Sequence, residues 1–393
     1  MALKHLFKLF SSEILIVAFG LIVGVFVARG FGVEAKGALA SIAAIVGLGS
    51  ALSSFGVTYS AVKLGSSNTN WIMIKFSVYG SIIALLFLVI YDLQGWSQFN
   101  VFHYILELYI ILFLTIYNLQ SLAFILSRSS KYYYPLAIVT GQVLAFLFLL
   151  VMFFIQQFEA IWVTLTTAAG QFFVSFYYIK KIHLSESKVR IGSLAQYLKL
   201  SLNQAPIVYI TAISVHIPIL ALSSVSLKEV GIYSVAAASV LVLGKIPRLL
   251  HGMTIGGIMF NGSGVRSDFF KLQFVMIFLI ALFHLMVSFL IQLLYGFNFL
   301  PAVSVAIILA YSMIPLIYIG LGEARLIVFE KYNTLIAYKF INVSLLVAAI
   351  FILLIFDFEF DAELIAWCIF GHRYLSFIFL IFTTRFASVR VFA

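Results

Sequence analysis

Residues 12–32 read SEILIVAFGLIVGVFVARGFG, a nearly unbroken apolar run. As an α-helix it is long enough to cross the hydrocarbon core of a bilayer, which needs about 20 such residues. Comparable runs follow almost end to end. Of the 393 residues 64% are hydrophobic and only 10% are charged, and the mean hydropathy is +1.15. A soluble domain of this composition would expose large apolar patches, so the sequence predicts a protein that lies mostly within a membrane.

We predict an all-α polytopic fold with about 12 transmembrane helices. The first six predicted spans are 12–32, 38–62, 72–91, 104–126, 136–158 and 160–179. The second six are 204–224, 231–256, 270–295, 302–322, 335–356 and 362–383. The first run is too long for the apolar region of a signal peptide, and no small-residue cleavage site follows it, so we expect it to remain as a helix.

The positions of lysine and arginine predict the orientation, because cytoplasmic loops near the spans retain positive charge. With both termini in the cytoplasm, nearly all of these residues fall in inner segments, and the outer loops hold only Lys36 and Lys228. The net charge of +10 is therefore read as a topology signal. Nucleic-acid binding is a poor explanation for it.

The chain divides into two halves that resemble each other locally. We expect a six-helix lobe over 1–180, a basic cytoplasmic linker over 181–200 and a second six-helix lobe over 201–393. Glu34 and Gly37, at the start of the second span, are echoed by Glu229 and Gly231 at the start of the eighth. Six spans in each half give equivalent helices the same direction, so the lobes would be related by a pseudo-two-fold axis along the membrane normal.

Ionisable residues inside spans are expensive in hydrocarbon and mark candidate functional sites. The deep ones are mostly cationic, and a buried cation without an acidic partner favours an anionic ligand such as phosphate or pyrophosphate. The candidate substrate-binding residues are Arg29, Lys245, Arg248 and Arg373. The alternative is that Lys245 and Arg248 snorkel to the inner headgroups and that Arg29 lies at the outer interface. His372 and Arg373 are adjacent and point to different faces, so at most one of them lines a cavity.

Coupling to a proton or sodium gradient remains open, as does transport driven by the substrate gradient itself. The titrating candidates for a relay are His216, His372, Glu107 and Glu323. We expect no cofactor, no catalytic residues and no metal site. The lone cysteine, Cys368, rules out an internal disulfide and reads as a small core residue.

Two further patterns concern packing and bending. Gly20 and Gly24, four residues apart in the first span, predict close helix packing, because small residues let backbones approach within a membrane. Prolines within or beside spans are expected to kink or break them. These prolines are Pro206, Pro218, Pro247 and Pro315.

Two segments carry a resemblance to a known family. Ala28-Arg29-Gly30-Phe31-Gly32, followed by Glu34, Gly37 and a helix rich in small residues that ends at Phe55-Gly56, resembles the entry of Wzx polysaccharide flippases. The segment 228–234, KEVGIYS, resembles the second signature of that family. The resemblance implies the fold of the multidrug/oligosaccharidyl-lipid/polysaccharide exporters, which is the MATE-like arrangement of two lobes with alternating access.

The same resemblance implies what is moved. The substrate would be an undecaprenyl-pyrophosphate-linked oligosaccharide, carried to the outer leaflet for O-antigen, capsule or exopolysaccharide synthesis, with a polysaccharide polymerase and a chain-length regulator as partners. The pyrophosphate agrees with the cationic residues derived above. Three alternatives stand beside this reading. They are a cation-coupled multidrug exporter of the same superfamily, a peptidoglycan-precursor flippase, and a polytopic polymerase or ligase, although the last usually has a long catalytic outer loop that this sequence lacks.

Overall fold

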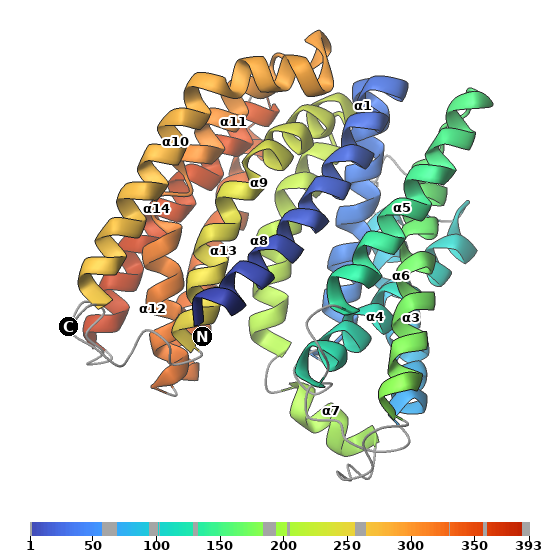
Figure 1. Ribbon diagram of the computed structural model, residues 1–393, viewed down its shortest axis with the longest axis horizontal. Coiled ribbons are helices and arrows are strands. Elements are labelled where there is room, and N and C mark those ends of the chain that lie inside the picture. The colour runs from blue at the N-terminus through green and yellow to red at the C-terminus, as the bar shows by residue number, and fades with distance from the viewer. Residues whose placement is uncertain are drawn as a thin grey trace. The chain divides into compact units, whose positions relative to one another are not determined.

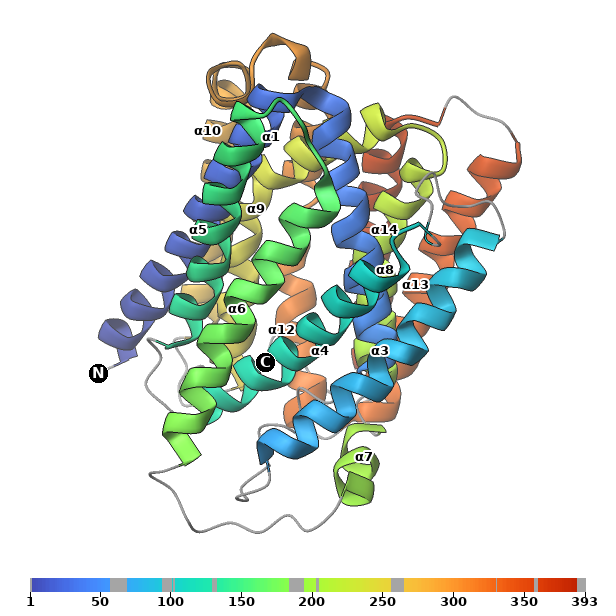
Figure 2. The ribbon, with the colours of Figure 1, turned by 90° about the vertical axis from the view of Figure 1, so that its right-hand side faces the viewer.

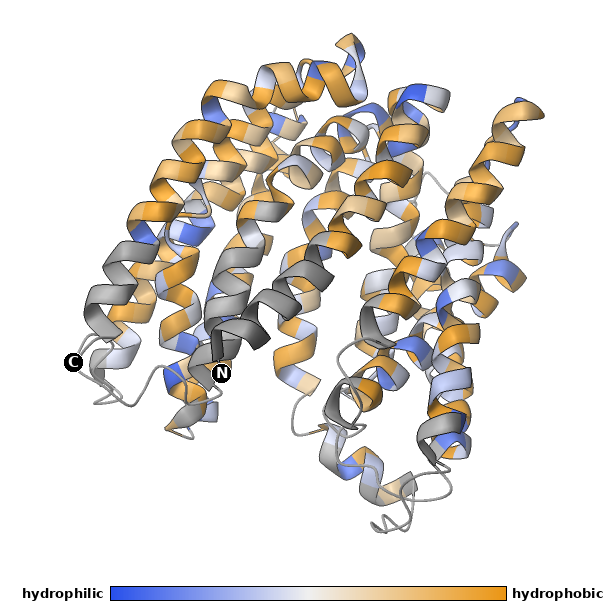
Figure 3. Ribbon diagram, in the orientation of Figure 1, coloured by the Kyte–Doolittle hydropathy of each residue, from blue (hydrophilic) through white to orange (hydrophobic). Residues whose placement is uncertain are grey.

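The computed structural model describes residues 2–56, 69–93, 101, 103–128, 133–183, 194–202, 205–255, 265–329, 331–356 and 360–386. Every regular element in these ranges is a helix, which confirms the predicted all-α class (Figure 1). Apolar residues cover most of the length of these helices, and polar ones lie at several ends and at a few points along them (Figure 3). This distribution is the one expected of helices whose middle portions lie in hydrocarbon.

The helices form two compact units, Leu3–Leu227 and Lys228–Ala393. The first contains α1 (Ala2–Ser53), α3 (Thr69–Leu93), α4 (Ile105–Arg128), α5 (Tyr133–Phe154), α6 (Ala160–His183), α7 (Leu194–Leu202) and α8 (Ala205–Ser223). The second contains α9 (Leu227–Ile255), α10 (Val265–Tyr295), the short 3-10 helix η1 (Phe297–Phe299), α11 (Ala302–Tyr311), α12 (Leu316–Val328), α13 (Tyr332–Ile355) and α14 (Ala362–Phe386). Since α8 packs with the first unit, the packing units divide later in the chain than the predicted 181–200 linker, and the division into functional lobes stays a prediction.

Each of the twelve predicted spans overlaps a helix of the described residues. By length and apolar composition, eight of these helices are able to cross a membrane, and nine if α11 and α12 together make one bent span. The helix α1 merges the first two predicted spans. The counterparts of the predicted sixth and eighth spans, α6 and α9, are helical but are not among the eight. The chain is accordingly a multi-pass membrane protein.

The first two spans are joined by a kink, where the sequence had predicted a loop at 33–37. All of these residues are helical, and the change of direction within α1 rests on Gly32, with φ 90° and ψ −172° (Figure 1). A side chain is strongly disfavoured in this backbone region, so glycine is what allows the turn at one residue. Lys36 therefore belongs to the second arm of α1 and not to an exposed loop.

Close backbone contact holds α5 against α6, and the two helices lie side by side in both ribbon views (Figures 1 and 2). A Cβ added to Gly170 would come within 2.8 Å of the Cα of Gly141, and one on Gly141 would lie 2.6 Å from the carbonyl oxygen of Thr167. Larger residues would force the helices apart. Within a membrane, where apolar burial drives helix association little, such close approach supplies the packing contacts.

The linker region carries a short helix docked on the first unit. In α7 the buried Tyr197 donates its hydroxyl hydrogen to Oε1 of Gln120, at 2.9 Å, and Gln120 Nε2 donates to Oγ of Ser77 at 3.1 Å. These bonds join α7 to α4 and α3. The predicted basic linker is thus partly helical, while its residues 184–193 lie outside the described part of the chain.

Candidate functional site

Two of the four predicted substrate-binding cations lie in α9. Lys245 and Arg248 are three residues apart in its helical backbone, so they share one face. Their side chains lie outside the described part of the structure. Their proposed contact with an anionic substrate stays a prediction.

Arg29 lies near the end of the first arm of α1, three residues before the kink at Gly32. Its side chain is exposed. Exposure agrees with either reading of this residue, as a ligand for an anion or as an interfacial arginine, and leaves both open.

Arg373, on α14, contacts the break between α11 and α12. Its Nη1 donates to Oγ of Ser312 at 2.6 Å and lies 3.4 Å from Sδ of Met313. The two helices bend by 45° at this break, and Pro315 stands directly before α12. The break at Pro315 confirms one of the predicted proline effects, because proline cannot continue the hydrogen-bond ladder.

Neighbouring helices satisfy the backbone groups that the break releases. The hydroxyl of Tyr374 donates to the carbonyl oxygen of Tyr311 at 3.5 Å, and Nε2 of Gln273 donates to that of Ile314 at 3.4 Å. Such support is required for an interrupted helix at membrane depth. Arg373 is consequently a structural contact of this break, whether or not it also meets a substrate.

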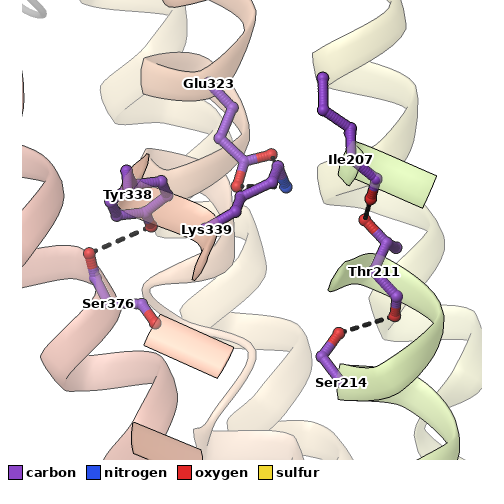
Figure 4. Close-up of polar contacts among 7 residues, drawn as sticks. All are labelled: Ile207, Thr211, Ser214, Glu323, Tyr338, Lys339 and Ser376. Atoms are coloured by element: carbon purple, nitrogen blue, oxygen red, sulfur yellow. Dashed lines mark hydrogen bonds and ion pairs between the residues drawn. The ribbon is translucent and has the colours of Figure 1, made fainter. Parts of the chain in front are cut away.

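Glu323, a predicted relay residue, is held by an ion pair. Both of its carboxylate oxygens lie 2.8 Å from Nζ of Lys339 (Figure 4). The side chains are only 16% and 19% exposed, so the pair lies largely out of water. Glu323 projects from α12 and Lys339 from α13. The carboxylate thus has a cationic partner within the protein itself.

A second group of polar side chains joins α13 to α14. Tyr338 donates its hydroxyl hydrogen to the carbonyl oxygen of Ser376 at 3.2 Å (Figure 4). The predicted relay residue His372 lies one turn before Ser376, with Nε2 3.5 Å from its Oγ. Asn342, one turn after Tyr338, is 4% exposed and its side-chain amide finds no hydrogen-bond partner among the described residues. His372 therefore lies among neutral polar groups, with the charged Arg373 next to it in the chain.

The other two relay candidates belong to the first unit. His216, on α8, packs its ring directly on Gly47 of α1, where an added Cβ would overlap it. This contact indicates a packing role for His216 and leaves a relay role untested. Glu107 is half-buried in the first turn of α4.

Sequence reasoning missed the role of Glu229. This residue lies in the first turn of α9, and its Oε2 accepts a hydrogen bond of 3.0 Å from the backbone amide of Ala362, the first residue of α14. The carboxylate accepts a hydrogen bond from an N–H group that has no partner within α14. Its negative charge also interacts favourably with the positive N-terminal end of the α14 helix dipole. The acidic residue of the KEVGIYS segment thus caps α14. The similarity between Glu34 and Glu229 in the sequence could not reveal this role.

The structure therefore brings Glu323, His372 and Arg373 into the second unit and places Arg29, Glu107 and His216 in the first. Among the described residues no group of three or more His, Cys, Asp or Glu side chains is placed to hold a metal ion. The polar groups that the second unit offers among its described residues are fixed charges and neutral hydrogen-bonding groups.

Comparison with solved structures identifies the class of fold. The lipid II flippase MurJ, in an inward-closed conformation, matches with a TM-score of 0.71 at 14% identity over 96% of this chain and 87% of that one. The MATE multidrug transporter DinF-BH matches with a TM-score of 0.69 at 16% identity over 98% and 95%. An inward-facing MATE transporter of the MOP superfamily gives 0.65 at 13% identity over 94% of each chain.

These structures share their fold with this chain, which confirms the predicted MATE-like architecture. No protein-family model matches the sequence, and no curated protein matches it either. At this level of identity the likeness concerns the fold alone.

Proposed function

We propose that this protein is a flippase of the MATE-like fold that carries an undecaprenyl-pyrophosphate-linked oligosaccharide across the bacterial inner membrane for surface polysaccharide synthesis. The observation that carries the proposal is the fold match to a lipid II flippase over 96% of the chain. The Wzx-like segments at 28–56 and 228–234 support the narrower choice of a polysaccharide repeat unit. The protein acts as a transporter and not as an enzyme.

Alternating access supplies the mechanism. The pyrophosphate enters an inward-open cavity, where Lys245 and Arg248, with Arg29 and Arg373, neutralise it while the prenyl tail remains in lipid. Rearrangement of the two lobes then exposes the headgroup to the other side. The bent α11–α12 span is the natural place for movement in the second unit, because its helical ladder is already interrupted.

A cation-coupled multidrug exporter is the alternative, and MATE transporters match the fold almost as well. Such an exporter needs an acidic group available to a proton, a sodium ion or a cationic drug. The Glu323 carboxylate is already bound on both oxygens by Lys339, which disfavours it in that role. If the transporter is coupled to an ion, His216, His372 and Glu107 are the remaining candidates.

Complementation tests the proposal. A bacterium that lacks its own repeat-unit flippase but makes the cognate lipid-linked glycan receives this chain, and polymer at the cell surface is measured. We expect wild type to restore polymer and Lys245→Ala/Arg248→Ala to abolish it at equal membrane abundance. Lys228→Ala, at an exposed position near the start of α9, is the matched control and should retain transport. Normal transport by the double variant would refute the cationic site.

A further inference from the structure

Two polar side chains pack against Gly20 and Gly24 of the first span. Nε2 of Gln142, from α5, lies 3.2 Å from the point that a Cβ on Gly20 would occupy. Nζ of Lys36, from the second arm of α1, lies 3.0 Å from the corresponding point on Gly24. The two glycines are one helical turn apart, about 6 Å along the axis. The missing side chains thus make room for an amide and an ammonium group.

The Lys36 ammonium has no counterion in the described part of the chain. No hydrogen bond or ion pair from a described residue reaches it, and its Nζ lies against Gly24, which is buried. The side chain as a whole is only half-buried, so a ligand can reach it. A cation that is poorly hydrated and lacks an acidic partner is costly, and an anion at this position would remove the penalty.

The Gln142 side chain lacks a hydrogen-bond donor, as Lys36 lacks an anion. Its Oε1 is buried and receives no hydrogen bond within the described residues. Buried acceptors are almost always satisfied, so an orphan one indicates a missing donor. The surroundings are apolar, because Val23 and Ala35, the chain neighbours of Gly24 and Lys36, pack on the cluster of Val27, Ala145 and Leu149. Low polarity strengthens any charge interaction formed there.

We propose that Lys36 and Gln142 form a binding subsite for a sugar phosphate, with a phosphoryl oxygen at the Lys36 ammonium and a sugar hydroxyl donating to Gln142 Oε1. One group supplies the anion that Lys36 lacks, and the other supplies the donor that Gln142 lacks. The subsite uses residues other than the four cations of the proposed function, and it rests on that function only for the source of the ligand, the headgroup of a lipid-linked glycan.

Binding to the purified full chain in detergent tests the subsite, with glucose 1-phosphate, inorganic phosphate and glucose as probes in titration calorimetry. We expect glucose 1-phosphate to bind most tightly. Lys36→Met should weaken it by about tenfold to a hundredfold, the range for a charge-assisted hydrogen bond. Gln142→Leu should remove the preference for glucose 1-phosphate over inorganic phosphate. Lys228→Met, which removes an exposed lysine, should leave every affinity unchanged.

A second variant guards against misfolding. Gly24→Ala keeps the charge but places a Cβ only 3.0 Å from Nζ of Lys36, so the ammonium must shift. The variant should weaken phosphate binding while the protein elutes as a single species in size-exclusion chromatography. Unchanged affinity in both Lys36→Met and Gly24→Ala, or no binding of glucose 1-phosphate to wild type, would overturn the proposal.

A prenylated probe distinguishes the source of the ligand. Tighter binding of farnesyl phosphate than of inorganic phosphate, lost in Lys36→Met, assigns the subsite to a membrane-borne headgroup. Equal binding of both assigns it to a free sugar phosphate. Because binding is read in purified protein, loss of the subsite is separable from failure of the polymer assay, which tests transport.

Discussion

The interiors of the two units are built from different polar chemistry. In the first unit the buried hydrogen bonds between helices join neutral groups, with Tyr197, Gln120 and Ser77 bonded in a chain and Asn118 donating to the carbonyl oxygen of Ala168. In the second unit the contacts involve charge, as in Glu323 with Lys339 and Arg373 with Ser312. Neutral bonds fix helices at little electrostatic penalty, whereas buried charges stabilise only while their partners stay in place. The second unit is therefore the more sensitive to rearrangement.

The largest effect is expected from the ion pair. Glu323→Ala leaves the Lys339 ammonium without its carboxylate in a poorly solvated position, which should lower stability by roughly 3 kcal/mol. Thermal unfolding in detergent measures this change. Glu323→Leu/Lys339→Leu replaces the ion pair by two apolar side chains, and it should recover most of the lost stability. If the double variant is as unstable as Glu323→Ala, charge is not the cause.

The helix bends of the two units also differ in what determines them. The kink in α1 depends on the backbone of Gly32, whereas the α11–α12 break is supported by side chains. Gly32→Ala should cost about 2 kcal/mol, since a side chain is strained at that φ and ψ. Gly371→Ala is the control, because it lies in the body of α14 with open space around its added Cβ. Equal unfolding temperatures for the two variants would contradict a backbone-determined kink.

Removing one neutral bond has a smaller effect. Tyr197→Phe leaves the buried Gln120 Oε1 without this donor and should cost about 1 kcal/mol. Tyr177→Phe, at an exposed position of α6, should cost nothing measurable.

The contribution of Tyr197 has a defined pH dependence. Burial raises the pKa of the Tyr197 phenol well above its ordinary value. Below the unfolded pKa of about 10, the phenol is protonated in both the folded and the unfolded state, so its contribution is constant; it falls only at higher pH. The difference in unfolding temperature should accordingly be the same at about pH 6 and about pH 9. A difference that shrinks between these values would indicate a phenol that ionises in the folded protein.

The smallest effect is expected at the α14 cap. Glu229→Gln keeps an acceptor for the Ala362 amide but removes the charge at the helix N-terminus, for a loss of about 0.5 kcal/mol. High salt should reduce the difference, because it screens a helix dipole. A difference in unfolding temperature that is unaffected by salt would assign the effect to packing.

The sequence predicted the features that depend on local composition. The apolar runs located the helices, and Pro315 located the break in the tenth span. The predicted loop between the first two spans was wrong, because the chain changes direction at the single residue Gly32. The partners of buried charges could not be predicted: Lys339 follows Glu323 by 16 residues, across the turn between two helices, and Ala362 follows Glu229 by 133. Such pairs depend on how helices pack, which helical periodicity does not encode.

The most direct test of the central claim is transport by the purified protein in liposomes. A short-chain prenyl-pyrophosphate disaccharide is placed in the inner leaflet, and its arrival outside is followed by lectin binding, with a cationic dye as the competing substrate. The account predicts that the wild-type chain moves the glycolipid, that Lys245→Ala/Arg248→Ala does not, and that neither moves the dye. Transport of the dye without transport of the glycolipid would contradict a flippase and identify a drug exporter.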